Sequence, residues 1–238
     1  MSERVKIILD KNADILRLPA IALRGLVVFP GNIIHFEVGR KKSIAAIEWA
    51  MSNNNAVFLT AQQDMDVEDP GFKDLYAYGV VAEVKQVLRV SDELVKVLVE
   101  GKYRAKLLTL DSSGRFLLAS TKAAALRGTK SVDSARVEAL VRSVKEAFEE
   151  YLSLNPRLSK DVVYTIITNE DAALLCDYIP ANLLLKYTDK QALLNEGTVS
   201  GRLEKLLEIL RRETKILHIE KDIQSKVNEQ MDKNQRDY

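Results

Sequence analysis

The stretch Tyr78–Ser120, YGVVAEVKQVLRVSDELVKVLVEGKYRAKLLTLDSSGRFLLAS, decides the fold class of this chain. It consists of short apolar runs, each about as long as a strand, separated by turn residues. Successive strands joined by short turns favour an antiparallel barrel or meander. The expected strands cover residues 78–90, 94–100, 103–110 and 115–120, and the breaks fall at Ser91-Asp92, Gly101 and residues 111–114.

Two further strands and one helix are expected before this stretch. Residues 33–38 alternate apolar and polar side chains, which is the period of a half-buried strand. Residues 56–60 are a compact apolar run, and residues 43–51 carry apolar side chains at helical spacing. The acidic segment 64–74, which contains Pro70-Gly71, is expected to be a surface loop.

The second half of the chain has a helical pattern. Between Gly128 and Gly197 there are two prolines and no glycine, and apolar residues recur at helical spacing from Val137 to Leu152. One long helix is therefore expected. Three shorter helices follow it, over residues 161–168, 171–178 and 189–194.

The last segment is the most regular, because residues 202–238 contain neither glycine nor proline. Beyond Glu220 its apolar stripe narrows to one residue per turn, at Ile223, Val227 and Met231. So narrow a stripe suits a projecting helix or a coiled-coil seam better than a face buried in a globule. The pattern runs to the last residue without a capping glycine, from which we expect a longer parent chain.

These patterns predict an α+β protein with three consecutive parts. A β-rich antiparallel barrel or meander is expected over residues 1–121, and a helical bundle over residues 122–200. A long projecting helix is expected over residues 201–238. We place the change from strands to helices near residues 121–131.

The composition excludes several classes of protein. The chain has 35 Lys and Arg against 34 Asp and Glu, which argues against broad binding to nucleic acid or to anionic membranes. The single cysteine, Cys176, cannot form an internal disulfide and favours a reducing compartment. No signal peptide is visible, and no stretch approaches the roughly 18 apolar residues of a membrane-spanning helix. A cytoplasmic protein with neither membrane nor nucleic-acid partners is therefore expected.

The sequence shows no catalytic or cofactor chemistry. It has two histidines, His35 and His218, and one cysteine, which form no cluster of metal ligands. Cys176 lies in an apolar run and is expected to be a buried, inert thiol. None of the ten glycines begins a phosphate-binding loop or a dinucleotide-binding turn. We therefore expect no catalytic residue, metal or cofactor in this chain.

Five blocks of the sequence are distinctive. They are LPAIALRGLVVFPG at residues 18–31, VGRKKSI at 38–44, VLVEG at 97–101 with Arg104, KQALL at 190–194 with Arg202-Leu203, and QMDKNQRDY at 230–238. In this order they resemble the N-terminal, substrate-recognition region of bacterial Lon ATP-dependent proteases. The last block is similar to the lead-in to the family's ATPase module.

The resemblance implies a function. Lon is a cytoplasmic ATP-dependent serine protease with a Ser-Lys dyad that works as a hexamer, and its N-terminal region helps to select unfolded or damaged proteins. The AAA+ ATPase and protease modules lie C-terminal to that region, so ATP and Mg²⁺ are expected only there. This chain is expected to be no enzyme itself, but a module that delivers unfolded proteins to the ATPase and protease ring.

The chain departs from the family's usual pattern at two places. His35 stands where an apolar residue or proline is common, which can alter a contact with substrate. Asn195–Gly197 stands where an acidic run is usual, which is expected only to reshape a loop.

A selector of unfolded proteins needs exposed apolar surface, because exposed apolar side chains distinguish a damaged protein from a folded one. Alternation places Leu98 on the solvent-facing side of residues 94–100, and Ile33 beside His35 on that side of residues 33–38. The expected substrate-binding residues are therefore Leu98, Ile33 and His35. The alternative is that a barrel buries parts of both faces, or that loops cover these side chains.

Other features receive structural interpretations. Ile223, Val227 and Met231 are expected to lie on a coupling helix between substrate recognition and the ATPase. As an alternative for the whole chain, its helical part mainly supports hexamer assembly. Arg40-Lys41-Lys42 is interpreted as a solvated helix start, and Arg24-Gly25 as a turn with a local ion pair.

Overall fold

The computed structural model describes residues 15–236 apart from residues 92, 129–133 and 156. The chain divides into two compact units, each made of two segments. The first is Met1–Arg127 with Asp177–Gly197, and the second is Gly128–Cys176 with Thr198–Tyr238.

These units are not the three consecutive parts expected from the sequence, because residues 177–197 group with the strands. The division at residues 1–121, 122–200 and 201–238 stays a prediction about domains. The expected change from strands to helices near residues 121–131 falls partly outside the described residues.

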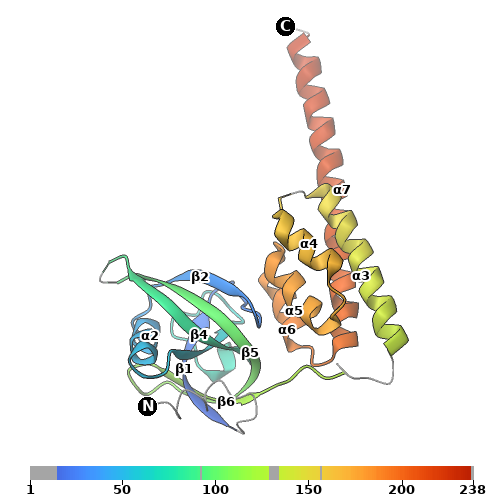
Figure 1. The fold of residues 1–238 in the computed structure, drawn as a ribbon. Coiled ribbons are helices and arrows are strands. Elements are labelled where there is room, and N and C mark those ends of the chain that lie inside the picture. The colour runs from blue at the N-terminus through green and yellow to red at the C-terminus, as the bar shows by residue number, and fades with distance from the viewer. Residues whose placement is uncertain (1–14, 92, 129–133, 156, 237–238) are drawn as a thin grey trace. The chain divides into compact units, whose positions relative to one another are not determined.

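The first unit is built on a six-stranded sheet in the order β2-β5-β4-β3-β1-β6. β5 also pairs with β6, so strands β5, β4, β3, β1 and β6 close into a barrel, and β2 extends the sheet beside β5 (Figure 1). The α+β class is confirmed. One pairing, that of β1 with β3, is parallel rather than antiparallel, because β2 and a helix intervene between the two strands. The strands are β1 (Leu16–Leu23), β2 (Ile33–Val38), β3 (Ala56–Ala61), β4 (Tyr78–Arg89), β5 (Val95–Asp111) and β6 (Leu117–Ala123).

β5 is one strand of 17 residues, whereas the sequence pattern predicted two strands broken at Gly101. That prediction was wrong because Gly101 permits a close approach of two backbones instead of making a turn. Its N–H donates to the Asn32 carbonyl at 2.9 Å, and its carbonyl accepts from the Gly31 N–H at 2.8 Å. A Cβ at Gly101 would lie 2.2 Å from the Phe29 carbonyl oxygen. The missing side chain therefore allows the turn before β2 to lie directly on β5.

One helix covers the sheet beside β1 and β3. It is α2 (Lys41–Asn53), and its apolar face, which includes Ala46, Ile47 and Ala50, is buried. Trp49 lies at the edge of this contact, with its ring centroid 5.7 Å from that of Phe116. After β3, the acidic loop contains a short 3-10 helix, η1 (Phe72–Asp74).

α6 (Tyr187–Asn195) also belongs to the first unit, and a buried arginine of β5 holds its C-terminal end. Arg104 donates to the Asn195 carbonyl at 2.8 Å, and its guanidinium lies 4.1 Å from the centre of the Tyr78 ring. A cation is favourable there because the last carbonyls of a helix carry partial negative charge. Gln191 of the same helix donates to the Tyr78 carbonyl at 2.9 Å. The sheet and α6 are thus joined by polar contacts.

The second unit is helical. α3 (Ser134–Leu154) packs along the first half of α7 (Val199–Arg236), and α4 (Lys160–Thr168) and the start of α5 (Ala172–Asn182) belong with them. Val144 and Phe148 of α3 and Leu203 and Leu206 of α7 are fully buried. Cys176 is also buried, with its Sγ 3.7 Å from the Val199 carbonyl oxygen. The core of this unit therefore comes from the periodic apolar residues of the sequence.

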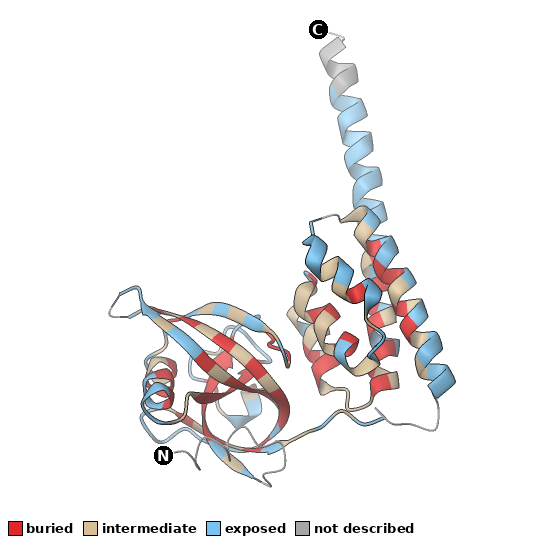
Figure 2. Ribbon diagram, viewed as in Figure 1, coloured by how far each residue is buried: buried red, intermediate tan, exposed pale blue. Residues whose placement is uncertain are grey.

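α7 changes character along its length (Figure 2). Its first turns alternate buried and exposed residues, whereas residues 221–231 are all exposed. The helix therefore begins within the second unit and continues as a solvated rod. No helix among the described residues is both long and apolar enough to cross a membrane.

Candidate functional site

The solvent-facing side of β2, β5 and β4 carries the residues predicted to bind substrate. His35 of β2 lies opposite Leu98 of β5, and Leu98 lies opposite Gln86 of β4. Opposite residues in an antiparallel pair have Cβ atoms about 5 Å apart, so these three side chains form one row. The neighbouring row places Leu88 of β4 opposite Lys96. We call Ile33, His35, Gln86, Leu88 and Leu98 the sheet patch.

The sheet patch is open to solvent. Ile33 is 62% exposed and Leu88 is 59% exposed, which are high values for large aliphatic side chains. His35 is exposed and Leu98 is half-buried, while Val97 and Val99 on the opposite side of β5 are fully buried. A shallow hollow of about 180 Å³ lies among these side chains. It is lined by His35, Gln86, Leu88, Lys96, Val97 and Leu98.

Sequence reasoning missed Leu88 because a β-bulge lies in β4. The register with β5 shifts between Val84 and Gln86, so that Lys85 is an extra residue on that strand. Strict alternation would have placed Leu88 on the buried side with Val84. The bulge reverses the alternation, and Leu88 faces solvent while Val87 is half-buried. No feature of the sequence alone marks the bulge.

Four charged residues lie on the same side of β4 and β5, next to the sheet patch. Lys85 lies 2.9 Å from Glu83 and 2.8 Å from Glu100, and Lys102 lies 2.9 Å and 2.6 Å from the same two carboxylates. Each lysine thus bridges two glutamates that face each other across the strands. Glu100 also lies opposite Ile33, so the charges border the apolar surface.

The ion pairs shift all four titrations. The hydrogen bond from Lys85 holds the pKa of Glu83 below its usual range, and the bond from Lys102 does the same for the pKa of Glu100. In turn, Glu100 raises the pKa of both Lys85 and Lys102, and Glu83 adds to the effect. The four residues therefore stay charged across the neutral range.

We expect replacement of both Glu83 and Glu100 by glutamine to lower the melting temperature near neutral pH. The two carboxylates have folded-state pKa values below the unfolded value of about 4.3, so they contribute stability above that pH. This contribution is lost as the pH falls through the folded-state pKa. Thermal melts from about pH 7 down to about pH 2.5 should show the deficit of the variant shrinking toward zero. A deficit that is constant over this range would contradict the assignment.

The residues predicted for the coupling helix lie on the solvated part of α7. Ile223, Val227 and Met231 are exposed, as is Ile219 before them. No described residue buries these side chains, so the apolar stripe can contact another surface. His218, which precedes the stripe, lies 3.7 Å from Glu150 of α3.

The described residues offer no metal site: none of their His, Cys, Asp and Glu side chains form a group of three or more able to hold an ion. The sheet patch and its border present aliphatic side chains, a histidine and ion pairs.

Comparison with known proteins identifies the family. The family described as the ATP-dependent protease La (LON) substrate-binding domain matches residues 17–212. The chain belongs to this Lon family. Lon protease of Desulforamulus reducens is 38% identical over 227 residues, and Lon protease of Escherichia coli K12 is 37% identical over 228 residues. These matches cover 95% and 96% of the chain but only 28% and 29% of the relatives.

Solved structures of Lon N-terminal domains share the fold. The N-terminal domain of a Mycobacterium avium complex Lon protease superposes with a TM-score of 0.66 at 20% identity, covering 82% of this chain and 98% of that one. The Lon N-terminal domain protein of Xanthomonas campestris gives 0.57 at 15% identity, covering 81% and 98%. The resemblance predicted from the sequence blocks is therefore confirmed.

Proposed function

We propose that this Lon substrate-binding domain binds exposed hydrophobic segments of unfolded or damaged proteins through the sheet patch. The observation that carries the proposal is the solvent exposure of Ile33 and Leu88 beside Leu98 on one sheet face. Each large aliphatic side chain that a client covers can contribute about 1.5–3 kcal/mol. Several such contacts give binding that is weak at each point and reversible, which suits inspection of many clients.

The rest of the proposal concerns the whole protein. Bound clients pass to a hexameric ATPase and protease ring in the cytoplasm, where ATP and Mg²⁺ drive unfolding and a Ser-Lys dyad cleaves the chain. The domain itself breaks no bond. The exposed stripe of α7, with Ile223, Val227 and Met231, couples the domain to that ring, because a continuous helix transmits a displacement along its axis.

A second function rests on a separate observation. The same exposed stripe on α7 suits a coiled-coil seam, so the chain can support hexamer assembly through this helix. In that case the sheet patch has little contact with clients.

An unfolded client and a folded control distinguish the two functions. We expect the chain to bind a casein-like unfolded protein in fluorescence anisotropy and to ignore a stably folded protein of similar size. Equal binding to both, or to neither, contradicts client recognition. If the chain also sediments as an oligomer while ignoring the unfolded client, assembly is its main role.

A further inference from the structure

A second hollow in the first unit lies between the end of β1 and the start of α2. Its volume is about 440 Å³, which is within the range of roughly 300–1,000 Å³ that small-ligand pockets occupy. It shares no lining residue with the hollow in the sheet patch. The lining is Ile21, Ala22, Leu23, Arg24, Leu26, Phe36, Glu37, Val38, Gly39, Arg40 and Ser43.

The lining has an apolar part and a cationic part. The apolar floor is Ile21, Leu23, Leu26, Phe36 and Val38. Of the charged residues, Arg24 and Arg40 are cations, and the anion Glu37 lies opposite Lys96 on β5. A ligand that fills this hollow therefore meets both apolar side chains and positive charge.

The start of α2 adds hydrogen-bond donors to the cationic side. The first turn of this helix contains no acidic residue, and its N-cap, Arg40, makes no side-chain cap. The first N–H groups of a helix have no acceptor within the helix, and they favour a negative charge. Ser43 of this turn lines the hollow and is only 5% exposed. Arg40 also lines the hollow, and its Nε is buried and has no hydrogen-bond partner among the described residues. A buried N–H donor without a partner indicates a place for a ligand's acceptor atom.

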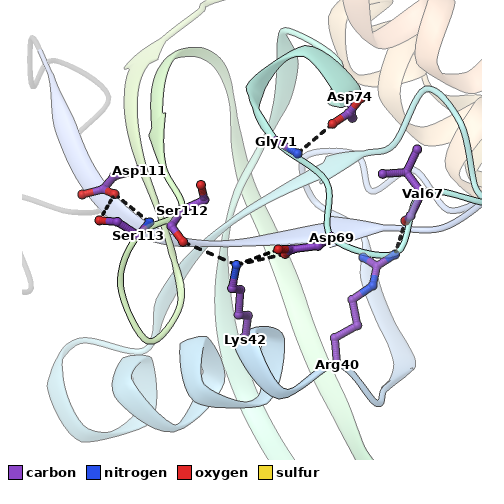
Figure 3. A network of polar contacts seen from close by, with 9 residues as sticks. All are labelled: Arg40, Lys42, Val67, Asp69, Gly71, Asp74, Asp111, Ser112 and Ser113. Atoms are coloured by element: carbon purple, nitrogen blue, oxygen red, sulfur yellow. Dashed lines mark hydrogen bonds and ion pairs between the residues drawn. The ribbon is translucent and has the colours of Figure 1, made fainter.

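The two arginines differ in how many hydrogen bonds they already make within the protein. The two Nη atoms of Arg40 are committed to the protein, because they donate to the Val67 carbonyl at 3.3 Å (Figure 3), to the Ala22 carbonyl at 3.1 Å and to the Gln62 side-chain oxygen. Arg24 is exposed and makes one hydrogen bond among the described residues, to the Val67 carbonyl at 3.4 Å. Its guanidinium therefore has donors left for an acceptor in the hollow.

The balance of charge around the two arginines is compatible with a bound anion. Burial, and then repulsion from Arg24, lowers the pKa of Arg40, while Asp69 and Glu68 act in the opposite direction. Asp69 is itself paired with Lys42 at 2.9 Å (Figure 3). A carboxylate placed beside Arg24 would offset the repulsion between the two guanidinium groups.

We propose that this hollow binds the C-terminal residue of a client polypeptide, with its carboxylate at the start of α2 beside Arg24 and its apolar side chain on the floor. The inference rests on the proposed function, since it names one end of a client as a ligand. A free inorganic anion would leave the apolar floor uncovered, and a residue within a chain carries no terminal charge. A terminal carboxylate with an apolar side chain satisfies both parts of the lining.

The test compares two forms of one labelled peptide, a short Gly-Ser sequence ending in leucine, either as the free acid or as the C-terminal amide. We expect the chain to bind the free acid about tenfold more tightly in fluorescence anisotropy, because charge-assisted hydrogen bonds are lost with the amide. Arg24→Gln should remove the preference. Arg142→Gln, which removes an exposed arginine of α3, should keep it.

Each other outcome overturns the inference. Equal affinity for the acid and the amide excludes a carboxylate site, and competition by inorganic phosphate as strong as that by the acid peptide indicates an anion site without chain recognition. Binding of neither peptide also excludes the site. If the unfolded client still binds in any of these cases, the sheet patch keeps its proposed function and only the hollow loses its role.

Discussion

Gly101→Ala is expected to destabilise the first unit by about 3 kcal/mol and to lower its melting temperature by roughly 10 °C. The new Cβ would lie 2.2 Å from the Phe29 carbonyl oxygen and 3.3 Å from Val80 Cγ1. The main obstacle is a backbone atom, which no side-chain rotation can move away. Relief requires separation of the turn at residues 29–32 from β5, which breaks the two hydrogen bonds that join them.

Gly114→Ala is the matched control for this substitution. Gly114 lies in the loop between β5 and β6, and a Cβ there would meet the Phe116 carbonyl oxygen at 3.7 Å, an ordinary contact. Its melting temperature should equal that of the parent chain. Calorimetry of the three proteins checks both expectations. Equal melting of Gly101→Ala and the parent would mean that the turn and the strand separate at little cost.

Leu98→Asp is expected to weaken binding of an unfolded client about tenfold while the melting temperature stays unchanged. Leu98 lies in the middle of the sheet patch, with His35 on one side and Gln86 on the other. The lost apolar contact corresponds to about 1.5 kcal/mol, and an apolar client that covers the new carboxylate would remove its hydration at a further cost. Because this side of β5 faces solvent, the aspartate stays hydrated and the fold tolerates it.

Thr109→Asp supplies the control, since Thr109 is an exposed residue of the same strand outside the sheet patch. Binding isotherms should show a loss of affinity for Leu98→Asp and none for Thr109→Asp. Leu88→Asp should behave like Leu98→Asp. Unchanged capture by the Leu98 and Leu88 variants would remove the sheet patch from client binding.

Local patterns were sufficient to predict most of the elements. Alternation located β2 and the first half of β5, and helical spacing located α3 and α7, because a half-buried strand and an amphipathic helix each repeat on their own period. The division of β5 at Gly101 was wrong because glycine punctuates turns and also permits close packing, and only the tertiary contact with Phe29 distinguishes the two.

Local sequence patterns also predict only part of the candidate sites. The solvent-facing positions of Ile33 and Leu98 follow from alternation, whereas that of Leu88 depends on a bulge that no residue type indicates. The hollow at α2 joins residues 21–26 with residues 36–43, which are apart in sequence. Arg40 was interpreted as part of a solvated helix start, yet its guanidinium holds the acidic loop. Arg24 was expected in a local ion pair, and instead it donates to the Val67 carbonyl.

The bulge at Lys85 has a consequence for how related chains can differ in length. Lys85 is the extra residue, so the strand on both sides of it keeps its pairing with β5, with Val84 opposite Val99 and Gln86 opposite Leu98. A chain that lacks this residue can form the same pairs without a bulge, and Leu88 then still faces the solvent. Loss of this single codon should therefore leave the sheet patch in place, whereas a strand of the present length without the bulge would turn Leu88 inward.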